Sequence, residues 1–250
     1  MNINNKTVKE VMKKVFILLS FIVFYTITYA QKNDFGVWTT IGAEKDITKK
    51  VTLSADLELR THNNAKSVDR WSGTLDLSYN LLSCLKVGGY YSYLHSLKDR
   101  SIKQTGEILS KYWYARHRFN FYVSGNYKID KFTFSIREMW QYTYRPEKRV
   151  AYESNDMTIN EMELIPGEGS NVLRSRLNID YNAVKDFFTP YASVEIYNDK
   201  NGIDKTRYTL GSNINITENS EFGIFYRYQV FGEKGVPKDH IIGLEYKFNI

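Results

Sequence analysis

The sequence ends on the stretch His240-Ile-Ile-Gly-Leu-Glu-Tyr-Lys-Phe-Asn-Ile250. Every second residue from Ile242 onward is apolar or aromatic, whereas the positions between them include Gly243, Glu245 and Lys247. This period of two predicts an amphipathic β-strand. Bacterial outer-membrane barrels commonly end on such a strand, with aromatic residues near its tip. The stretch therefore predicts an all-β fold, a transmembrane antiparallel up-and-down β-barrel.

The same strand carries a short pattern of its own. Gly243, Tyr246 and Phe248 are spaced as Gly-x-x-aromatic-x-aromatic, which resembles the signal that the barrel-assembly machinery reads. We therefore expect that machinery and outer-membrane lipid to be partners of the chain.

The first thirty residues are arranged like a secretory signal peptide. Lys13 and Lys14 precede the apolar run 15–27, and Ala30 ends a small-residue cleavage site. A transmembrane anchor needs roughly 18 or more apolar residues, whereas this run has thirteen (27 − 15 + 1). We expect residues 1–30 to be cleaved and residues 31–250 to form one barrel domain in the outer membrane.

The remaining charge argues against a nucleic-acid partner. Residues 1–30 hold four lysines and one glutamate, so cleavage lowers the net charge from +6 to +3 (6 − 4 + 1). The other charges are spread singly along the expected strands and form no basic patch. Cys84 is the only cysteine, which excludes an intrachain disulfide.

Alternating segments follow one another from residue 34 to the end without a linker. Most are longer than the roughly 5–6 residues of a typical strand and suit the roughly 9–11 that a tilted membrane strand requires. The expected strands are 34–44, 50–61, 68–81, 84–95, 112–127, 131–145, 171–182, 189–198, 205–217, 221–231 and 240–250.

Connections between these segments alternate in length. The longer ones are expected at 62–67, 96–111, 146–170, 199–204 and 232–239. Outer-membrane barrels have short periplasmic turns and longer outer loops, so loop 146–170 should face outside. The segments number eleven, but single-chain bacterial barrels are expected to have an even number. We therefore expect ten to twelve strands and favour twelve, with segment 34–44 short, tucked against a rim or broken in two.

One face of the segments is apolar, with aromatic residues toward the segment ends, as Trp140, Tyr142 and Tyr144 illustrate. Aromatic girdles of this kind lie at the two surfaces of a membrane. A soluble β-protein with an apolar interior, located in the periplasm, is the alternative.

The opposite face is charged and would line the barrel interior. Its cations are Arg60, Arg70, Lys86, Arg116, Arg118, Arg137, Arg174, Arg176, Arg207, Arg227 and Lys247. Its anions are Glu44, Asp56, Glu58, Asp76, Asp180, Glu195 and Glu245.

Two interpretations of this interior stay open. The charges could neutralise one another in a salt-bridged plug, in which Asp56 and Glu58 are possible partners of Arg116, Arg118, Arg174 and Arg176. Alternatively, the excess of arginines, whose planar forks suit carboxylate and phosphate, could line a narrow anion path. We favour the plug.

The sequence offers little support for catalysis. Lipid-modifying barrel enzymes, such as phospholipases and lipid A deacylases, use a His-x-Ser pair, and none of the four histidines has this spacing. The histidines are scattered, so no metal site and no cofactor are expected. His117 and Glu138 are the residues to watch. Because Glu138 falls on the apolar face, we expect a β-bulge that turns it inward or a position near the membrane surface.

Several short motifs resemble one family, DUF2490, taken to comprise small exported outer-membrane barrels of diderm bacteria. The motifs lie at 34–40, 57–60, 68–71, 115–120, 136–138, 144–146, 172–177, 189–191 and 205–211. The resemblance implies the fold and the compartment, and it implies no activity. The favoured function is a non-enzymatic outer-membrane barrel, either a structural or binding protein or a narrow pore, and the alternative is a lipid-modifying barrel enzyme.

Overall fold

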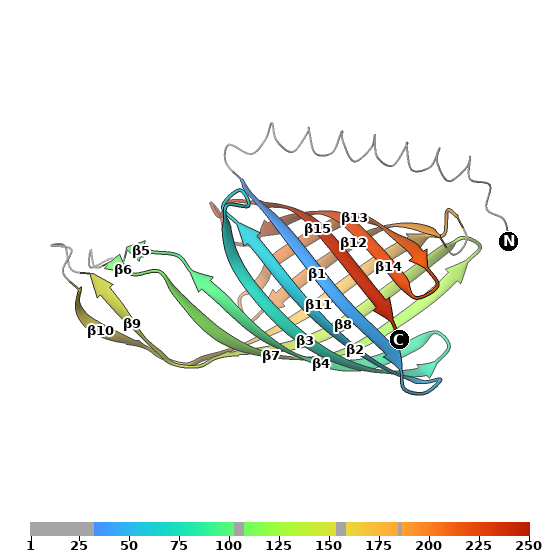
Figure 1. The fold of residues 1–250 in the computed structure, drawn as a ribbon, viewed down its shortest axis with the longest axis horizontal. Helices are drawn as coiled ribbons and strands as arrows, with labels where there is room; N and C mark the ends of the chain where they lie inside the picture. Colours follow the sequence, from blue (N-terminus) through green and yellow to red (C-terminus); the bar gives the residue numbers. More distant parts are fainter. Residues whose placement is uncertain (1–32, 103–107, 154–158, 185–186) are drawn as a thin grey trace.

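The computed structural model describes residues 33–102, 108–153, 159–184 and 187–250, and the expected signal peptide lies outside these ranges. Eleven strands of the described residues close into a barrel, in the order β1-β15-β14-β13-β12-β11-β8-β7-β4-β3-β2 (Figure 1). No described residue belongs to a helix with the length and apolarity needed to cross a membrane. The barrel strands are β1 (Asp34–Asp46), β2 (Val51–His62), β3 (Ser67–Leu82), β4 (Leu85–Lys98), β7 (Tyr112–Ile129), β8 (Phe132–Arg145), β11 (Glu168–Tyr181), β12 (Phe188–Asp199), β13 (Gly202–Thr217), β14 (Ser220–Phe231) and β15 (Asp239–Asn249).

The first and last strands close the barrel in parallel. Their register runs from Asp34 opposite Asp239 to Glu44 opposite Asn249, and Figure 1 shows β1 and β15 side by side. Every other neighbouring pair in the barrel is antiparallel. The eleven strands lie within the expected ten to twelve, but the favoured number of twelve was wrong. Segment 34–44 is a full strand, and its parallel pairing allows an odd number of strands to close.

The start of β1 is fixed at the rim that carries the longer connections. The Asp34 carboxylate accepts hydrogen bonds from the backbone N–H groups of Asn63 and Asn64, at 3.1 and 2.9 Å. Both asparagines and Ala65 have positive φ, between 54° and 61°, and asparagine tolerates this conformation better than most residues. The turn between β2 and β3 is thereby tied to β1.

A second, four-stranded sheet continues the barrel wall beyond this rim (Figure 1). Its strands are β5 (Ser101–Ile102), β6 (Ile108–Leu109), β9 (Lys148–Glu153) and β10 (Ile159–Ile165). Their order, β10-β9-β6-β5, repeats the order β11-β8-β7-β4 of the barrel strands from which they continue. Segments 96–111 and 146–170, expected to be loops, therefore contain paired strands.

The two faces of the barrel are inverted relative to those of a soluble protein. The outward side chains of Leu57, Phe121 and Leu177 are 68%, 61% and 61% exposed. An exposed apolar face of this kind is typical of outer-membrane barrels. In the described interior, the buried apolar cluster is small and consists of Trp38, Phe225 and Ile241. Alternation along each strand thus places apolar side chains outside and polar ones inside.

Candidate functional site

The barrel interior holds a cavity of about 520 Å³ midway along the strands. Most of the predicted interior residues line it: Asp56, Glu58, Arg60, Arg70, Asp76, Arg116, Arg118, Arg137, Arg174, Arg176, Arg207 and Glu245. Glu195 pairs with two of these arginines. Arg227 lies elsewhere in the interior, where its Nε donates to Thr209 Oγ1 at 3.0 Å. The alternation of the sequence therefore identified the cavity wall.

One charged cluster gathers around Glu58. Its carboxylate accepts hydrogen bonds from Arg60 Nη2 at 2.7 Å, from Ser72 Oγ at 3.2 Å and, at the limit of 3.5 Å, from Arg70 Nη2. These four residues come from strands β2 and β3, and their spacing of two places them all on the inner face. One carboxylate thus serves two buried arginines.

A second cluster gathers around Glu195. Arg174 Nη2 donates to its Oε1 at 2.8 Å, Tyr197 Oη donates to its Oε2 at 2.8 Å, and Arg207 Nη1 lies 3.9 Å from Oε2. Arg174 and Glu195 have side chains only 13% and 9% exposed. Removal of one member of this cluster would leave a buried charge uncompensated.

Arg174 also reaches across the interior. Its Nη1 donates to Tyr90 Oη of β4 at 3.3 Å and to Gln141 Oε1 of β8 at 3.2 Å. With Glu195 on β12, one side chain of β11 therefore connects three other strands.

Trp38 of β1 forms an aromatic centre beside the Glu195 cluster, because Arg207 contacts both. The guanidinium carbons of Arg60, Arg207 and Arg227 lie 3.3, 5.2 and 5.0 Å from the centre of its ring. Guanidinium groups are attracted to the face of an aromatic ring within about 6 Å. Trp38 thus links strands β1, β2, β13 and β14.

The predicted partners of the arginines were partly wrong. Arg174 pairs with Glu195, whereas Glu58 pairs with Arg60 and Arg70. Asp180 is not among the cavity residues and accepts a hydrogen bond from Asn178 Nδ2 at 2.7 Å. Sequence reasoning also missed several residues that line the cavity, among them Tyr90, Gln141, Tyr197 and Lys205. Lys205 lies two positions before Arg207, so the same alternation could have found it.

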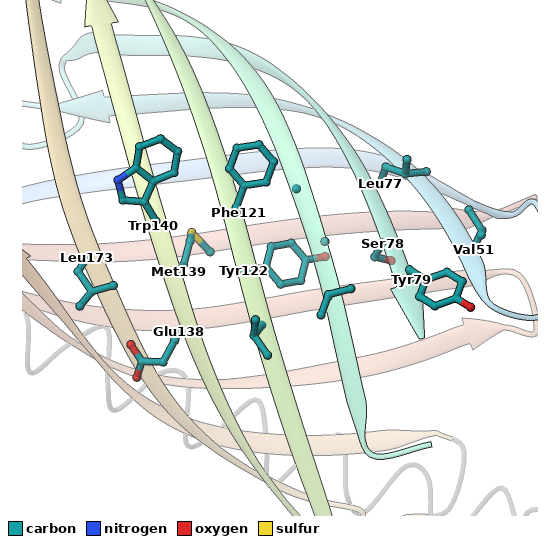
Figure 2. A pocket seen from close by; sticks show the side chains of 14 residues that line it. Val51, Leu77, Ser78, Tyr79, Phe121, Tyr122, Glu138, Met139, Trp140 and Leu173 are labelled. Atoms are coloured by element: carbon teal, nitrogen blue, oxygen red, sulfur yellow. The ribbon is translucent and has the colours of Figure 1, made fainter. Parts of the chain in front are cut away.

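Glu138 faces outward with no bulge to turn it. The ladder around it is continuous, with Arg137 opposite Arg176 and Glu138 opposite Ser175. Of the two expected alternatives, the bulge was therefore wrong, and the position near the membrane surface stays a prediction. Ser175 Oγ donates to the Glu138 carboxylate at 2.7 Å. Glu138 lies beside an apolar depression of about 660 Å³ that also borders Trp140 and Leu173, as Figure 2 shows.

His117 lies apart from Glu138. It faces outward and bonds through Nδ1 to Tyr91 Oη at 2.8 Å. Its partner in the ladder, Tyr144, is six residues along β8 from Glu138 (144 − 138), roughly 20 Å at about 3.4 Å per residue. The two candidates for catalysis are therefore not assembled into a pair. The described residues include no group of three His, Cys, Asp or Glu side chains that could hold a metal ion.

The final strand lies as its alternation predicts. Tyr246 and Phe248 point outward and are 40% and 43% exposed, whereas Gly243 is buried inside. Its role as an assembly signal stays a prediction.

The model of a protein family of unknown function, DUF2490, matches residues 35–238. This match spans most of the chain. The chain belongs to the DUF2490 family.

Solved structures similar to this DUF2490 protein are outer-membrane barrels. The translocator domain of the autotransporter NalP from Neisseria meningitidis is similar with a TM-score of 0.58 at 12% identity, covering 90% of this chain and 92% of that one. The beta domain of the Bordetella autotransporter BrkA is similar with a TM-score of 0.51 at 9% identity, covering 80% and 81%. At such low identity the similarity concerns the fold alone. No curated protein sequence matches the DUF2490 protein.

Proposed function

We propose that this DUF2490 protein is a non-enzymatic barrel of the bacterial outer membrane whose ion-paired interior is closed to steady ion flow. The observation that carries this proposal is the buried cluster of Arg174, Glu195 and Arg207. Buried charges are retained when they are paired and hydrogen-bonded, and these side chains occupy space that an open channel would need.

Contacts between strands that are not neighbours support a filled interior. Arg174 connects β11 with β4, and Trp38 stacks with Arg207 of β13. Barrels of eight strands are filled by side chains, whereas those of sixteen leave a channel. Eleven strands lie between these cases, and long arginine side chains can bridge the additional width.

The compartment and orientation follow from the same proposal. The expected signal peptide would export the chain, the apolar outer face would contact outer-membrane lipid, and the short turns would face the periplasm. The four-stranded sheet would then project from the outer side.

Conductance measurements test whether the interior is closed. The purified barrel in a planar bilayer should show no steady conductance, whereas Arg174→Ala should leak, because it removes the contacts to Tyr90, Gln141 and Glu195. Arg145→Ala, which breaks an exposed rim pair with Glu168, is the matched control. Steady, anion-selective current through the wild-type barrel would refute a closed interior.

A lipid-modifying enzyme is the alternative, and the separation of His117 from Glu138 argues against it. His117→Ala and Glu138→Gln should leave the phospholipid and lipid A profiles of the cells unchanged. Altered acyl-chain content at an unchanged amount of folded barrel would favour the enzyme.

A further inference from the structure

The cavity in the barrel interior contains more positive than negative charge. Nine cationic and four anionic side chains line it. Glu195, which pairs with Arg174 and Arg207, and Asp204, which pairs with Lys205, add two anions, so the excess is three positive charges (9 − 4 − 2). Uncompensated charge inside a protein is costly, and this excess requires counterions.

Four of the cavity arginines contribute to this excess: Arg116, Arg118, Arg137 and Arg176. Within the described part of the chain, none of them has a carboxylate within 4.0 Å. Arg116 Nη2 donates to Ser96 Oγ at 2.7 Å, and Arg118 Nε donates to Thr143 Oγ1 at 3.2 Å. Arg137 stacks on the Tyr122 ring at 4.8 Å. These neutral partners leave Arg116, Arg118 and Arg137 without a contacting carboxylate, whereas Arg176 lies opposite Glu195 in the ladder between β11 and β12.

Several donors in this wall are buried without an acceptor. The Nε atoms of Arg116 and Arg137 have no hydrogen-bond partner, and neither does the Nε of Arg70, whose side chain is 8% exposed. Buried polar groups are normally hydrogen-bonded. These Nε–H groups are donors on cationic side chains beside the cavity and have no acceptor. We therefore expect the cavity to bind a negatively charged acceptor.

The pairing of Arg137 with Arg176 also favours an anion in the cavity. The two arginines are direct cross-strand partners of β8 and β11, with both side chains on the cavity wall. Like charges directly opposite each other destabilise a sheet. An anion between them would turn this repulsion into attraction.

We propose that the interior cavity binds an extended polyanion of phosphate type, held by the Arg116–Arg118 pair at one level and the Arg137–Arg176 pair at another. The two levels are six residues apart along β8, because Arg118 lies opposite Thr143 (143 − 137), and this corresponds to about 20 Å of strand. Arginine side chains are long, so the guanidinium groups of the two levels can lie closer together than the strand positions that carry them. Guanidinium forks bind phosphate oxygens in pairs, and the cavity volume is that of an ordinary ligand site. This inference builds on the closed interior of the proposed function.

Binding of tripolyphosphate to the detergent-folded full-length barrel tests the site. Isothermal titration at constant ionic strength should give one tripolyphosphate per barrel, with chloride showing no binding. The Arg116→Gln/Arg118→Gln and Arg137→Gln/Arg176→Gln variants should each weaken binding by about tenfold or more, since each loses charge-assisted hydrogen bonds. Arg227→Gln is the matched control, because Arg227 is an interior arginine outside the cavity lining, and it should stay within about twofold.

Heat-dependent gel mobility shows which variants are folded. If a variant does not fold, the binding of one tripolyphosphate per wild-type barrel still tests the site. Absence of tripolyphosphate binding to the folded wild-type barrel would overturn the site. So would equal weakening by Arg227→Gln, or an effect of only one arginine pair. Conductance is measured separately, so a conducting barrel that binds tripolyphosphate would refute the closed interior alone, and a closed barrel that does not bind would refute the site alone.

Discussion

The ring of Phe225 lies over Gly243 inside the barrel, so close that a Cβ at position 243 would sit 2.0 Å from the ring Cζ. Phe225 is only 4% exposed and packs in the cluster with Trp38 and Ile241. Gly243 is therefore required by packing on β15.

Gly243→Ala should lower the free energy of unfolding by about 1–3 kcal/mol, since the ring has little room to move. Urea unfolding of the lipid-folded barrel measures this loss. Phe225→Leu in the Gly243→Ala background removes the ring atoms and should recover part of it. A fully stable Gly243→Ala barrel would show that the ring moves aside freely.

Glu195→Gln should destabilise the barrel by about 3–5 kcal/mol, because it leaves Arg174 and Arg207 buried without their carboxylate. The control is Glu168→Gln, which alters an exposed rim pair with Arg145 and should cost less than about 1 kcal/mol. Denaturant unfolding of both variants makes the comparison. Equal, small losses would contradict the role given to Glu195.

Glu138→Leu should stabilise the barrel, by up to about 2 kcal/mol, because a carboxylate on the lipid-facing surface is unfavourable. Ser175→Ala in that background should add little, since the hydroxyl has lost its acceptor. Unfolding in lipid vesicles measures both variants. A large loss of stability in Glu138→Leu would show that Glu138 has a structural partner in the membrane.

The rim beyond β4 contains a pH-sensitive pair. A hydrogen bond from His62, 2.7 Å away, lowers the pKa of Asp99 below its ordinary value of 3.8. A lowered pKa means that ionised Asp99 stabilises the folded state above about pH 3.8, and this contribution is lost as the pH falls through the lowered pKa. Because Asp99 is 57% exposed, the effect on stability should be small.

A carboxyl NMR titration of Asp99 tests this pair directly. His62→Ala should bring the pKa of Asp99 back toward 3.8. Lys111→Ala removes a more distant cation, 3.6 Å from Asp99, and should have the smaller effect. A larger effect of Lys111→Ala than of His62→Ala would show that the lysine is the main cause of the lowered pKa of Asp99.

Alternation in the sequence was enough to predict the strands and the two faces, because a period of two depends only on local backbone geometry. It placed Arg174 and Glu195 inside and Leu57 outside. It could not predict that Arg174 meets Glu195 and not Glu58, because that choice depends on the stagger between strands around the closed barrel.

The errors at β1 and Glu138 have a common cause. In both places the alternation agrees with the structure, whereas a general rule about membrane barrels does not. The eleven segments counted from the sequence are the strands of the barrel, yet the usual even number favoured twelve. Glu138 points outward as its position indicates, and a bulge was expected because a lipid-facing charge is costly. Strands β5 and β6 were missed because they have only two residues each, too few for a period to be recognised. Strands β9 and β10, with six and seven residues, were missed because they lie within the segment expected to be the longest outer loop.

The parallel seam between β1 and β15 determines where the two ends of the barrel chain emerge. Ten antiparallel pairings reverse the chain direction ten times, so the last strand runs the same way as the first. Asp34 therefore lies at the rim with the projecting sheet, and Ile250, whose N–H bonds to Glu44 O, lies at the rim with the short turns. In a membrane these rims belong to different compartments. A tag placed just before β1 and a tag placed after Ile250 would be accessible from opposite sides, which is the arrangement of a chain that crosses an odd number of times.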